Sequence, residues 1–599
     1  MVAPVKDRAV VIRAGVAHTL AVMGLASNAS PVVRLLRAAA LAGSFVSLGP
    51  ACRTGRPAEP GAPSSGSALV SPADDEAVIG RGILRRAGEQ IVDASGRPVR
   101  WRGVAFGNQV WGGRALPVTH HDEADFQRVR AMGMNAVRFY MFYGTFEDDV
   151  TPGRYKEAGW QWLDRNVGWA RRHGVYLILN MHVPPGGFQS NGEGHALWES
   201  PALQDRLVAL WRAIAARYAG EPIVAGYDLL NEPGVSRGKA QWQSLAARIT
   251  RAIREVDPRH IIIVERVNSI AKKWTNDDDM NFFLVDDANA VYTFHFYDPF
   301  PYTHQLASWA HMGEGGKYPD DNKLARSSDT KWLNIATFDS PTLPPGDSGW
   351  THSVSPPLVA SDARARVGHV SLVGRAVGAG RAVFDDLVIE ERDERGAPPG
   401  EVARLDLRNT GGWYFWSVDG SGRSGSLADG HGGPGALTID GTSDDANLGS
   451  AQHEFALKPG HAYTVSGWMR GERLPAGARV QIRLDFLGVD GPVMGWNRDF
   501  LRAAVDRYRA WGHAHGVPLF LGEFGLHRPC FEQDRGGLVW VEDMLDLLEE
   551  DGLSFTYHAY HEDAFGIYRG NGRVDPARAN QGLIDLFTRK LASSRTGGH

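Results

Sequence analysis

The sequence is poor in cysteine. Only two cysteines, Cys52 and Cys530, occur among 599 residues. Two cysteines cannot form the disulfide framework of a small secreted domain or a cysteine-rich metal cluster. No residue beside Cys530 in the sequence could serve as its base, so we do not expect Cys530 to be a nucleophile. We therefore expect neither a metal ion nor another cofactor.

The chain also lacks an excess of positive charge. Its 64 Lys and Arg and 69 Asp and Glu give a formal net charge of −5, and no basic stripe is evident. We therefore expect no nucleic-acid partner. The hydrophobic fraction of 43% and the charged fraction of 22% are those of an ordinary soluble globular protein, which we expect to be a monomer. This length predicts about three to four domains, or fewer if one is a barrel.

The N-terminal region has no apolar run long enough to span a bilayer. Residues 38–49 are apolar but short and interrupted. Arg34 and Arg37 precede this run, and Pro50-Ala51-Cys52 follows it, which is the layout of a signal peptide. A cysteine after small residues resembles a bacterial lipoprotein signal, although Gly49 stands where a leucine is usual.

We therefore predict a signal or lipoprotein-like segment at residues 1–52, with membrane attachment through a lipidated Cys52. Residues 53–75 are rich in Pro, Gly, Ser and Ala and indicate a flexible linker. The protein would then be secreted, periplasmic or held at the cell surface. The alternative is a disordered, alanine-rich tail.

Predicted strands and helices alternate from residue 102 onward, after a predicted hairpin at residues 82–101. Short apolar runs bounded by turn residues predict the strands, and apolar residues at helical spacing predict the helices. The strands are expected at 102–107, 135–139, 175–181, 223–230, 260–264 and 291–296, and the helices at 122–132, 161–173, 203–218 and 239–256. This many alternating units favour a closed (β/α)8 barrel with a parallel sheet.

The alternation stops between about residues 332 and 490. Short alternating runs separated by glycine-rich turns replace it, which is typical of an antiparallel β-sandwich. Strands at 518–521 and 553–558 and helices at 499–515, 537–550 and 577–591 then complete the barrel. The predicted fold is an α/β TIM barrel, formed by residues 76–331 and 491–599, with a sandwich of residues 332–490 inserted after barrel strand six.

Two glutamates end predicted barrel strands. Pro233 cannot continue a central strand, so the fourth strand must stop at Asn231 and Glu232. The seventh strand ends in Gly522-Glu523-Phe524-Gly525. Because strand ends meet at the C-terminal mouth of a barrel, both carboxylates should face one site. A pair about 5 Å apart suits cleavage of a glycosidic bond with retention, with one carboxyl protonated and the other ionised.

Other strand ends carry side chains that fit this chemistry. Arg138 could keep the nucleophile ionised, and Asn231 could bind a sugar 2-hydroxyl. His182, His295 and Tyr297 end strands three and six and could position the substrate. Each of these residues alone could have only a structural role, but together they favour a catalytic site.

In this set of residues the chain resembles glycoside hydrolase family 5, the cellulase-like (β/α)8 family. The resemblance spans about residues 82–591 without the insertion, and it implies that Glu232 is the general acid/base and Glu523 the nucleophile. The family often has a tryptophan at the end of strand eight. This chain has His558 and Tyr560 there, either of which could replace it. Trp111 and Trp198, in loops after strand ends, are expected to line the sugar cleft, although packing is an alternative role.

The insertion resembles β-sandwich carbohydrate-binding modules. Trp413, Tyr414 and Trp416 are candidate sugar contacts, with a core role as the alternative. The sequence therefore predicts a retaining β-glycoside hydrolase whose partner is a carbohydrate substrate of the β-glucan or β-mannan type. The alternatives are a non-catalytic surface carbohydrate-binding protein, and a transglycosylase or glycolipid glycosidase on the same scaffold.

Overall fold

The computed structural model describes residues 82–593, except for 114–115, 191–193, 275, 326–330, 406, 451–452 and 491–493. The predicted signal segment and linker, with Cys52, lie outside these residues. Within the described part of the chain, none of the helices has the length and apolar character needed to cross a membrane.

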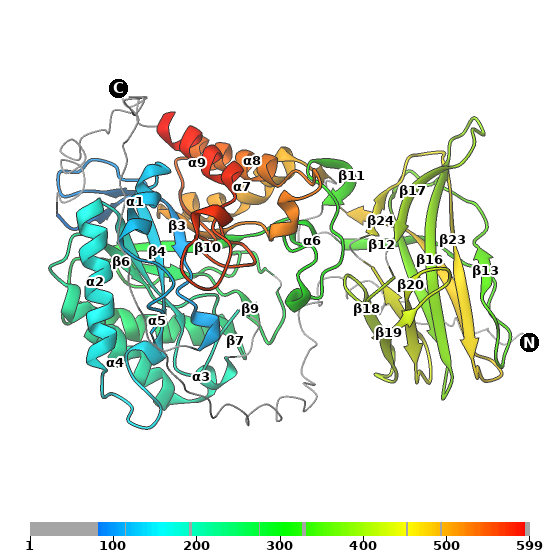
Figure 1. Cartoon of the computed structure of the whole chain (residues 1–599), viewed down its shortest axis with the longest axis horizontal. Coiled ribbons are helices and arrows are strands. Elements are labelled where there is room, and N and C mark those ends of the chain that lie inside the picture. Colours follow the sequence, from blue (N-terminus) through cyan, green and yellow to red (C-terminus); the bar gives the residue numbers. More distant parts are fainter. Residues whose placement is uncertain are drawn as a thin grey trace, which may run out of the picture.

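Eight parallel strands close into a barrel, which confirms the predicted fold class (Figure 1). In barrel order the strands are β3 (Arg102–Phe106), β4 (Ala136–Phe142), β5 (Tyr176–Val183), β6 (Val224–Asp228), β8 (Ile261–Glu265), β10 (Ala290–Phe296), β26 (Leu519–Phe524) and β27 (Ser554–Tyr557). Nearly every residue of these strands is buried, because side chains fill the barrel on one face and helices cover the other.

Helices follow most of the barrel strands, and sequence signals set their ends. They are α1 (Glu123–Ala131), α2 (Glu157–His173), α3 (His195–Glu199), α4 (Pro201–Tyr218), α5 (Lys239–Arg254), α6 (Phe300–Thr303), α7 (Arg498–His515), α8 (Gly537–Glu550) and α9 (Gln581–Ser593). Asp122 caps α1 in a capping box, and Ser200 caps α4 just before Pro201. Gly174 ends α2 with a left-handed φ of 58°.

The predicted hairpin at residues 82–101 is only partly present. β1 (Arg85–Ala87) pairs with β2 (Gln90–Val92), whereas the expected partner strand contributes a single bridge between Val92 and Pro98. Pro98 has no N–H to extend a ladder. The chain instead passes from the Asp93 turn to the fully buried Trp101, which packs edge-on against Phe520 of the barrel.

Two antiparallel sheets, which we call the sandwich, lie between β10 and β26 in the sequence. One contains β12 (Lys331–Asp339), β15 (Ala365–Arg375), β18 (Tyr414–Ser417), β21 (Ala446–Gly449), β22 (Phe455–Ala456) and β24 (Arg479–Asp490). The other contains β13 (Thr351–Val354), β14 (Leu358–Val359), β16 (Arg381–Arg392), β17 (Gly400–Leu405), β19 (Arg423–Asp429), β20 (Pro434–Asp440) and β23 (Ala462–Glu472).

The sandwich has a hydrophobic core of its own, separate from that of the barrel. Figure 1 shows it beside the barrel, on the side of α6 and β11. The two segments that link the barrel to the sandwich pair with each other as a short antiparallel sheet, β11 (Asp320–Ala325) with β25 (Met494–Trp496). A second small sheet, β7 (Gly234–Val235) with β9 (Ser269–Ile270), follows the ends of β6 and β8. After the insertion, β26 and β27 complete the barrel.

Candidate active site

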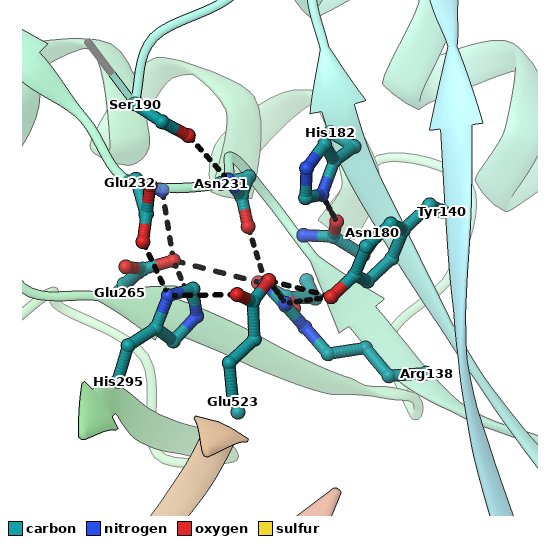
Figure 2. Close-up of polar contacts among 12 residues, drawn as sticks. Arg138, Tyr140, Asn180, His182, Ser190, Asn231, Glu232, Glu265, His295 and Glu523 are labelled. Atoms are coloured by element: carbon teal, nitrogen blue, oxygen red, sulfur yellow. Dashed lines mark hydrogen bonds and ion pairs between the residues drawn. The ribbon is translucent and has the colours of Figure 1, made fainter. Parts of the chain in front are cut away.

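Glu523 lies inside β26, where side chains from two other strands surround its carboxylate (Figure 2). Arg138 Nη1 donates to Oε1 at 2.5 Å, and the Tyr140 hydroxyl donates to the same oxygen at 2.6 Å. The Tyr297 hydroxyl donates to Oε2 at 2.7 Å. The side chain of Glu523 is only 5% exposed. Both oxygens of Glu523 are thus held in one orientation.

These neighbours also fix the charge of Glu523. Burial by itself would raise the pKa of this carboxyl. The nearby His295, His558 and Arg138 outweigh burial and hold the pKa of Glu523 well below its usual range. Glu523 is therefore ionised at neutral pH, as a carboxylate nucleophile must be.

Arg138 connects Glu523 to the end of β6. It is fully buried, and its Nε donates to Asp228 Oδ2 at 2.7 Å. Its Nη2 donates to Asn231 Oδ1 at 3.1 Å. Removing one partner of such a buried ion pair typically costs about 3–5 kcal/mol, because a charge is left without compensation in the interior. Arg138 therefore stabilises the fold as well as the charge of Glu523.

Glu232 has a different environment. It follows β6 in a left-handed conformation with a φ of 43°, which is uncommon for a residue with a side chain. Its backbone N–H donates to Glu265 Oε2 at 2.9 Å, and His295 Nδ1 contacts its Oε1 at 2.9 Å. The side chain is 16% exposed, about three times the exposure of Glu523. Glu232 can therefore exchange a proton with a bound molecule or with water.

The two carboxylates are close together. An oxygen of Glu232 and an oxygen of Glu523 lie within 4.8 Å of each other, with His295 Nδ1 at 2.9 Å from the first residue and 3.5 Å from the second. This spacing could also admit a cation. However, both oxygens of Glu523 already accept hydrogen bonds from side chains that fix its position, so the arrangement fits an acid–nucleophile pair better.

The other predicted residues divide into those that reach the site and those that do not. His182 stacks on Tyr140 with ring centroids 3.9 Å apart, and His558 Nδ1 is 3.1 Å from the Tyr140 hydroxyl. Trp111 lies edge-on against His182 and His558 and is 45% exposed. Its indole is therefore available to a ligand at the mouth of the site.

Trp198 and Tyr560 were predicted as substrate contacts, and the structure places both in the interior. Trp198 is 2% exposed, and its indole N–H donates to Gln189 Oε1 at 2.9 Å. Tyr560 is fully buried, and its hydroxyl donates to Asp125 Oδ1 at 2.7 Å. Large aromatic side chains are drawn into a core when a polar partner for their N–H or O–H is available there. Of the two candidates at the end of strand eight, only His558 reaches the site.

Three site residues were absent from the sequence prediction: Tyr140, Asp228 and Glu265. Tyr140 lies two residues after Arg138 in a strand, so alternation places both on the same face. Glu265 ends the apolar run of β8 in the same way that Glu523 ends that of β26. Both signals were present in the sequence. Asp228 gave none, because its partner Arg138 is 90 residues away.

Part of the chain is similar to known glycoside hydrolases. Residues 92–339 match the family model for cellulase (glycosyl hydrolase family 5). Endoglucanase C of Acetivibrio thermocellus is 32% identical over 213 residues, which cover 35% of this chain and 60% of that enzyme. A beta-xylosidase of Phanerodontia chrysosporium is 30% identical over 178 residues, 29% of this chain and 37% of the relative.

A solved structure, that of endoglucanase Cel5A from the hyperthermophilic Thermotoga maritima, aligns over 81% of this chain and 96% of that one. The alignment has 15% sequence identity and a TM-score of 0.43. Residues 92–339 are thus similar to the cellulase-type domain of glycosyl hydrolase family 5, and the described part of the chain closes into a barrel of eight parallel strands.

Proposed function

We propose that this protein is a retaining β-glycoside hydrolase that acts on β-linked glycans of the β-glucan or β-mannan type. The observation that carries the proposal is the pair Glu232 and Glu523. Their oxygens lie within 4.8 Å, close to the separation of about 5 Å that a retaining mechanism uses. The similarity to a relative named Endoglucanase C supports a β-glucan substrate.

In the first step, an oxygen of Glu523 attacks the anomeric carbon of the bound sugar and forms a C–O bond. The glycosidic C–O bond breaks, and Glu232 gives its proton to the departing oxygen. Arg138, Tyr140 and Tyr297 orient Glu523 for this attack, because together they hold both of its oxygens.

In the second step, water attacks the anomeric carbon of the glycosyl-enzyme and Glu232 accepts a proton from it. The bond to Glu523 breaks, and the electron pair returns to its carboxylate. The donors that held the ionised nucleophile stabilise this returning charge. Two displacements at the same carbon give a product with the anomeric configuration of the substrate.

The substrate would lie over the site between exposed and polar side chains. Asn231 is held by Arg138 and by Ser190, to which its Nδ2 donates at 3.3 Å, so its position beside Glu232 is fixed. Trp111 presents an aromatic ring on which a sugar ring can stack. Trp111 lies edge-on against Tyr140, His182 and His558 alike.

The test is hydrolysis of a panel of β-glucans, β-mannans, aryl β-glycosides and glycolipids by the purified protein. The variants Glu523→Gln and Glu232→Gln serve as matched controls, since each keeps the size of the side chain. Loss of cleavage in both variants, with retention of anomeric configuration in the parent's product, supports the proposal. Binding without cleavage by the parent would favour a carbohydrate-binding protein. Transfer to added sugars in place of water would favour a transglycosylase.

Export, and anchoring at the cell surface through a lipidated Cys52, are also proposals. A Cys52→Ala variant should no longer incorporate labelled fatty acid and should leave the membrane fraction.

Carbohydrate binding by the sandwich is a proposal too. Trp413 is 4% exposed and belongs to the sandwich core, whereas Tyr414 and Trp416 of β18 are partly exposed. Binding to insoluble glycans should therefore weaken in Trp416→Ala if the sandwich binds sugar through that strand.

A further inference from the structure

Glu265, at the end of β8, connects the two halves of the site. One of its oxygens, Oε2, accepts the backbone N–H of Glu232 at 2.9 Å. The same oxygen lies 3.4 Å from His295 Nε2 and 3.7 Å from Arg138 Nη2. Its side chain is 2% exposed, so water cannot replace these contacts readily. Figure 2 shows this carboxyl group next to Glu232 and the imidazole of His295.

The contact to Glu232 acts on the backbone and not on its carboxyl group. Glu232 holds a left-handed φ of 43°, a conformation that persists only where neighbouring groups fix it. The hydrogen bond from its N–H to Glu265 fixes the start of that turn. The direction of the Glu232 side chain, and hence its distance from Glu523, depends on this bond.

The contact between Glu265 and His295 acts on the imidazole that lies close to both Glu232 and Glu523. One ring nitrogen of His295 faces Glu232 and Glu523, and the other faces Glu265. This second contact is an ion-pair distance without a hydrogen bond, and an ionised carboxylate at that distance favours the doubly protonated imidazole. A change at Glu265 therefore reaches Glu232 by two routes, through the backbone and through the imidazole.

Resting on the function proposed above, we propose that Glu265 is a positioning residue. It holds the left-handed Glu232 and the imidazole of His295 in one arrangement through a single shared carboxyl oxygen. It does not touch the reacting atoms.

The charge of Glu265 changes near neutral pH. Burial, with Glu232 and Asp228 acting in the same direction, raises its pKa to about 8 against the opposing effects of His295 and Arg138. Burial lowers the pKa of His295, but nearby carboxylates led by Glu265 and Glu523 raise it to about 9. Below about pH 8 Glu265 is therefore mostly protonated, and its support for the charged form of His295 grows as it ionises. Above about pH 8 Glu265 becomes an anion beside both His295 and the Glu232 turn.

The experiment compares Glu265→Gln and Glu265→Ala with the parent over about pH 5 to 9.5. Gln keeps an acceptor oxygen but cannot ionise. We expect its kcat at pH 6 to stay within about threefold of the parent, and the parent's change in kcat/KM near pH 8 to disappear. Ala removes the acceptor, so kcat should fall at least about tenfold at every pH, with KM within about twofold.

Asp257→Asn is the matched control. Asp257 is also a buried carboxylate and lies before the opposite end of β8, where it accepts from the Tyr227 hydroxyl at 2.7 Å. The Asp257→Asn substitution should lower the free energy of unfolding without altering the dependence of kcat/KM on pH. The proposal is overturned if Asp257→Asn changes the profile as Glu265→Gln does. It is also overturned if Glu265→Gln has the parent's profile, or if Glu265→Ala raises KM and leaves kcat intact.

A second readout does not need turnover, so it separates this inference from the proposed function. The folded pKa of Glu265 lies above its usual value of 4.5, so its protonated form favours the folded state. That contribution is complete below about pH 4.5 and is lost as the pH rises through about 8. The Tm of Glu265→Gln minus that of the parent should therefore increase between about pH 5 and 9. A difference that is constant with pH overturns the inference even if hydrolysis is confirmed.

Discussion

The ends of β6 and β26 are similar in sequence and different in structure. Each apolar strand leads to a glutamate, Glu232 or Glu523. Glu523 lies within its strand, 5% exposed, and three donors from β4 and the end of β10 hold its two oxygens. Glu232 lies beyond its strand in a left-handed turn, 16% exposed, and its carboxyl meets only His295 among the hydrogen-bond donors described. The neighbours, and not the glutamates themselves, hold Glu523 ionised and fixed and leave Glu232 more accessible.

The largest effects should come from removing the two carboxylates. We expect Glu523→Ala to lose at least about 10⁴-fold in kcat on every substrate, because no covalent intermediate forms. Glu232→Ala should lose about 10² to 10⁴-fold on glycans but much less on aryl glycosides, whose leaving groups need no proton. Rates on a glycan and on an activated aryl glycoside measure this difference.

Added azide separates the two roles further. In Glu232→Ala it should attack the glycosyl-enzyme and give a β-glycosyl azide, whereas in Glu523→Ala it should attack the substrate directly and give an α-glycosyl azide. The products are distinguished by NMR. The reverse assignment of azide products would mean that the two residues have exchanged roles.

A smaller effect is expected from Tyr297→Phe, which removes the 2.7 Å donor to Glu523 Oε2. A hydrogen bond to a charged group contributes about 1.5–3 kcal/mol, so kcat should fall about 10- to 100-fold. Because the donor stabilises the ionised form, its loss raises the pKa of Glu523 and moves the acid limb of kcat/KM to higher pH.

Tyr302→Phe provides the control for this pH shift. Tyr302 is also buried and its hydroxyl donates to the backbone oxygen of Arg535 at 2.8 Å, away from Glu523. Its loss should leave the acid limb in place. An unchanged acid limb in Tyr297→Phe would show that this hydroxyl does not hold Glu523 in its charged form.

Substitutions of two tryptophans test the difference between Trp111, which is exposed at the mouth of the site, and Trp198, which is buried. Trp111→Ala should raise KM about tenfold, since a stacking contribution of about 1–1.5 kcal/mol is lost, with little change in Tm. Trp198→Ala should instead cost about 3–5 kcal/mol of stability, because it leaves a cavity in the core. Initial rates over a range of substrate concentrations, with thermal unfolding, distinguish the two. A larger rise in KM for Trp198→Ala than for Trp111→Ala would show that Trp198 contacts the substrate.

The smallest effect on activity is expected from Tyr560→Phe. This change leaves Asp125 without the 2.7 Å hydrogen bond and should cost about 1–3 kcal/mol of stability. KM and kcat should stay within about twofold of the parent, because the hydroxyl faces α1 and not the site. A tenfold change in KM with an unchanged Tm would show that Tyr560 contacts the substrate.

Local physics made much of the barrel predictable. Helix ends followed caps such as Asp122 and Gly174, and some strands, such as β3 before Gly107 and β5 before Pro184, end at glycine or proline. The glutamates were visible because they end such runs. The strand limits were less predictable: β4 continues to Phe142, three residues past the expected end, because its later residues are still covered by neighbouring strands.

Side-chain burial in loops was harder to predict. Trp111, Trp198 and Trp413 looked alike as candidate sugar contacts, but only Trp111 remains substantially exposed. Whether a loop tryptophan is exposed depends on segments distant in the sequence that cover it. In the sandwich, Trp413 packs into a core whose side chains come from strands throughout the insertion, for example Leu448 of β21 and Tyr463 of β23.

The sequence by itself determined which residues could carry the chemistry and at which end of the barrel they would lie. Alternation of strands and helices, and a glutamate at two strand ends, follow from local propensity and from the rule that parallel strands share one mouth. The tertiary structure alone decided what each glutamate can do. Arg138 reaches Glu523 across 385 residues of sequence, and Glu265 joins Glu232 to His295, only because closure of the barrel aligns strands from distant parts of the chain. The charge of a buried group depends on such neighbours, and no local pattern of residues specifies them.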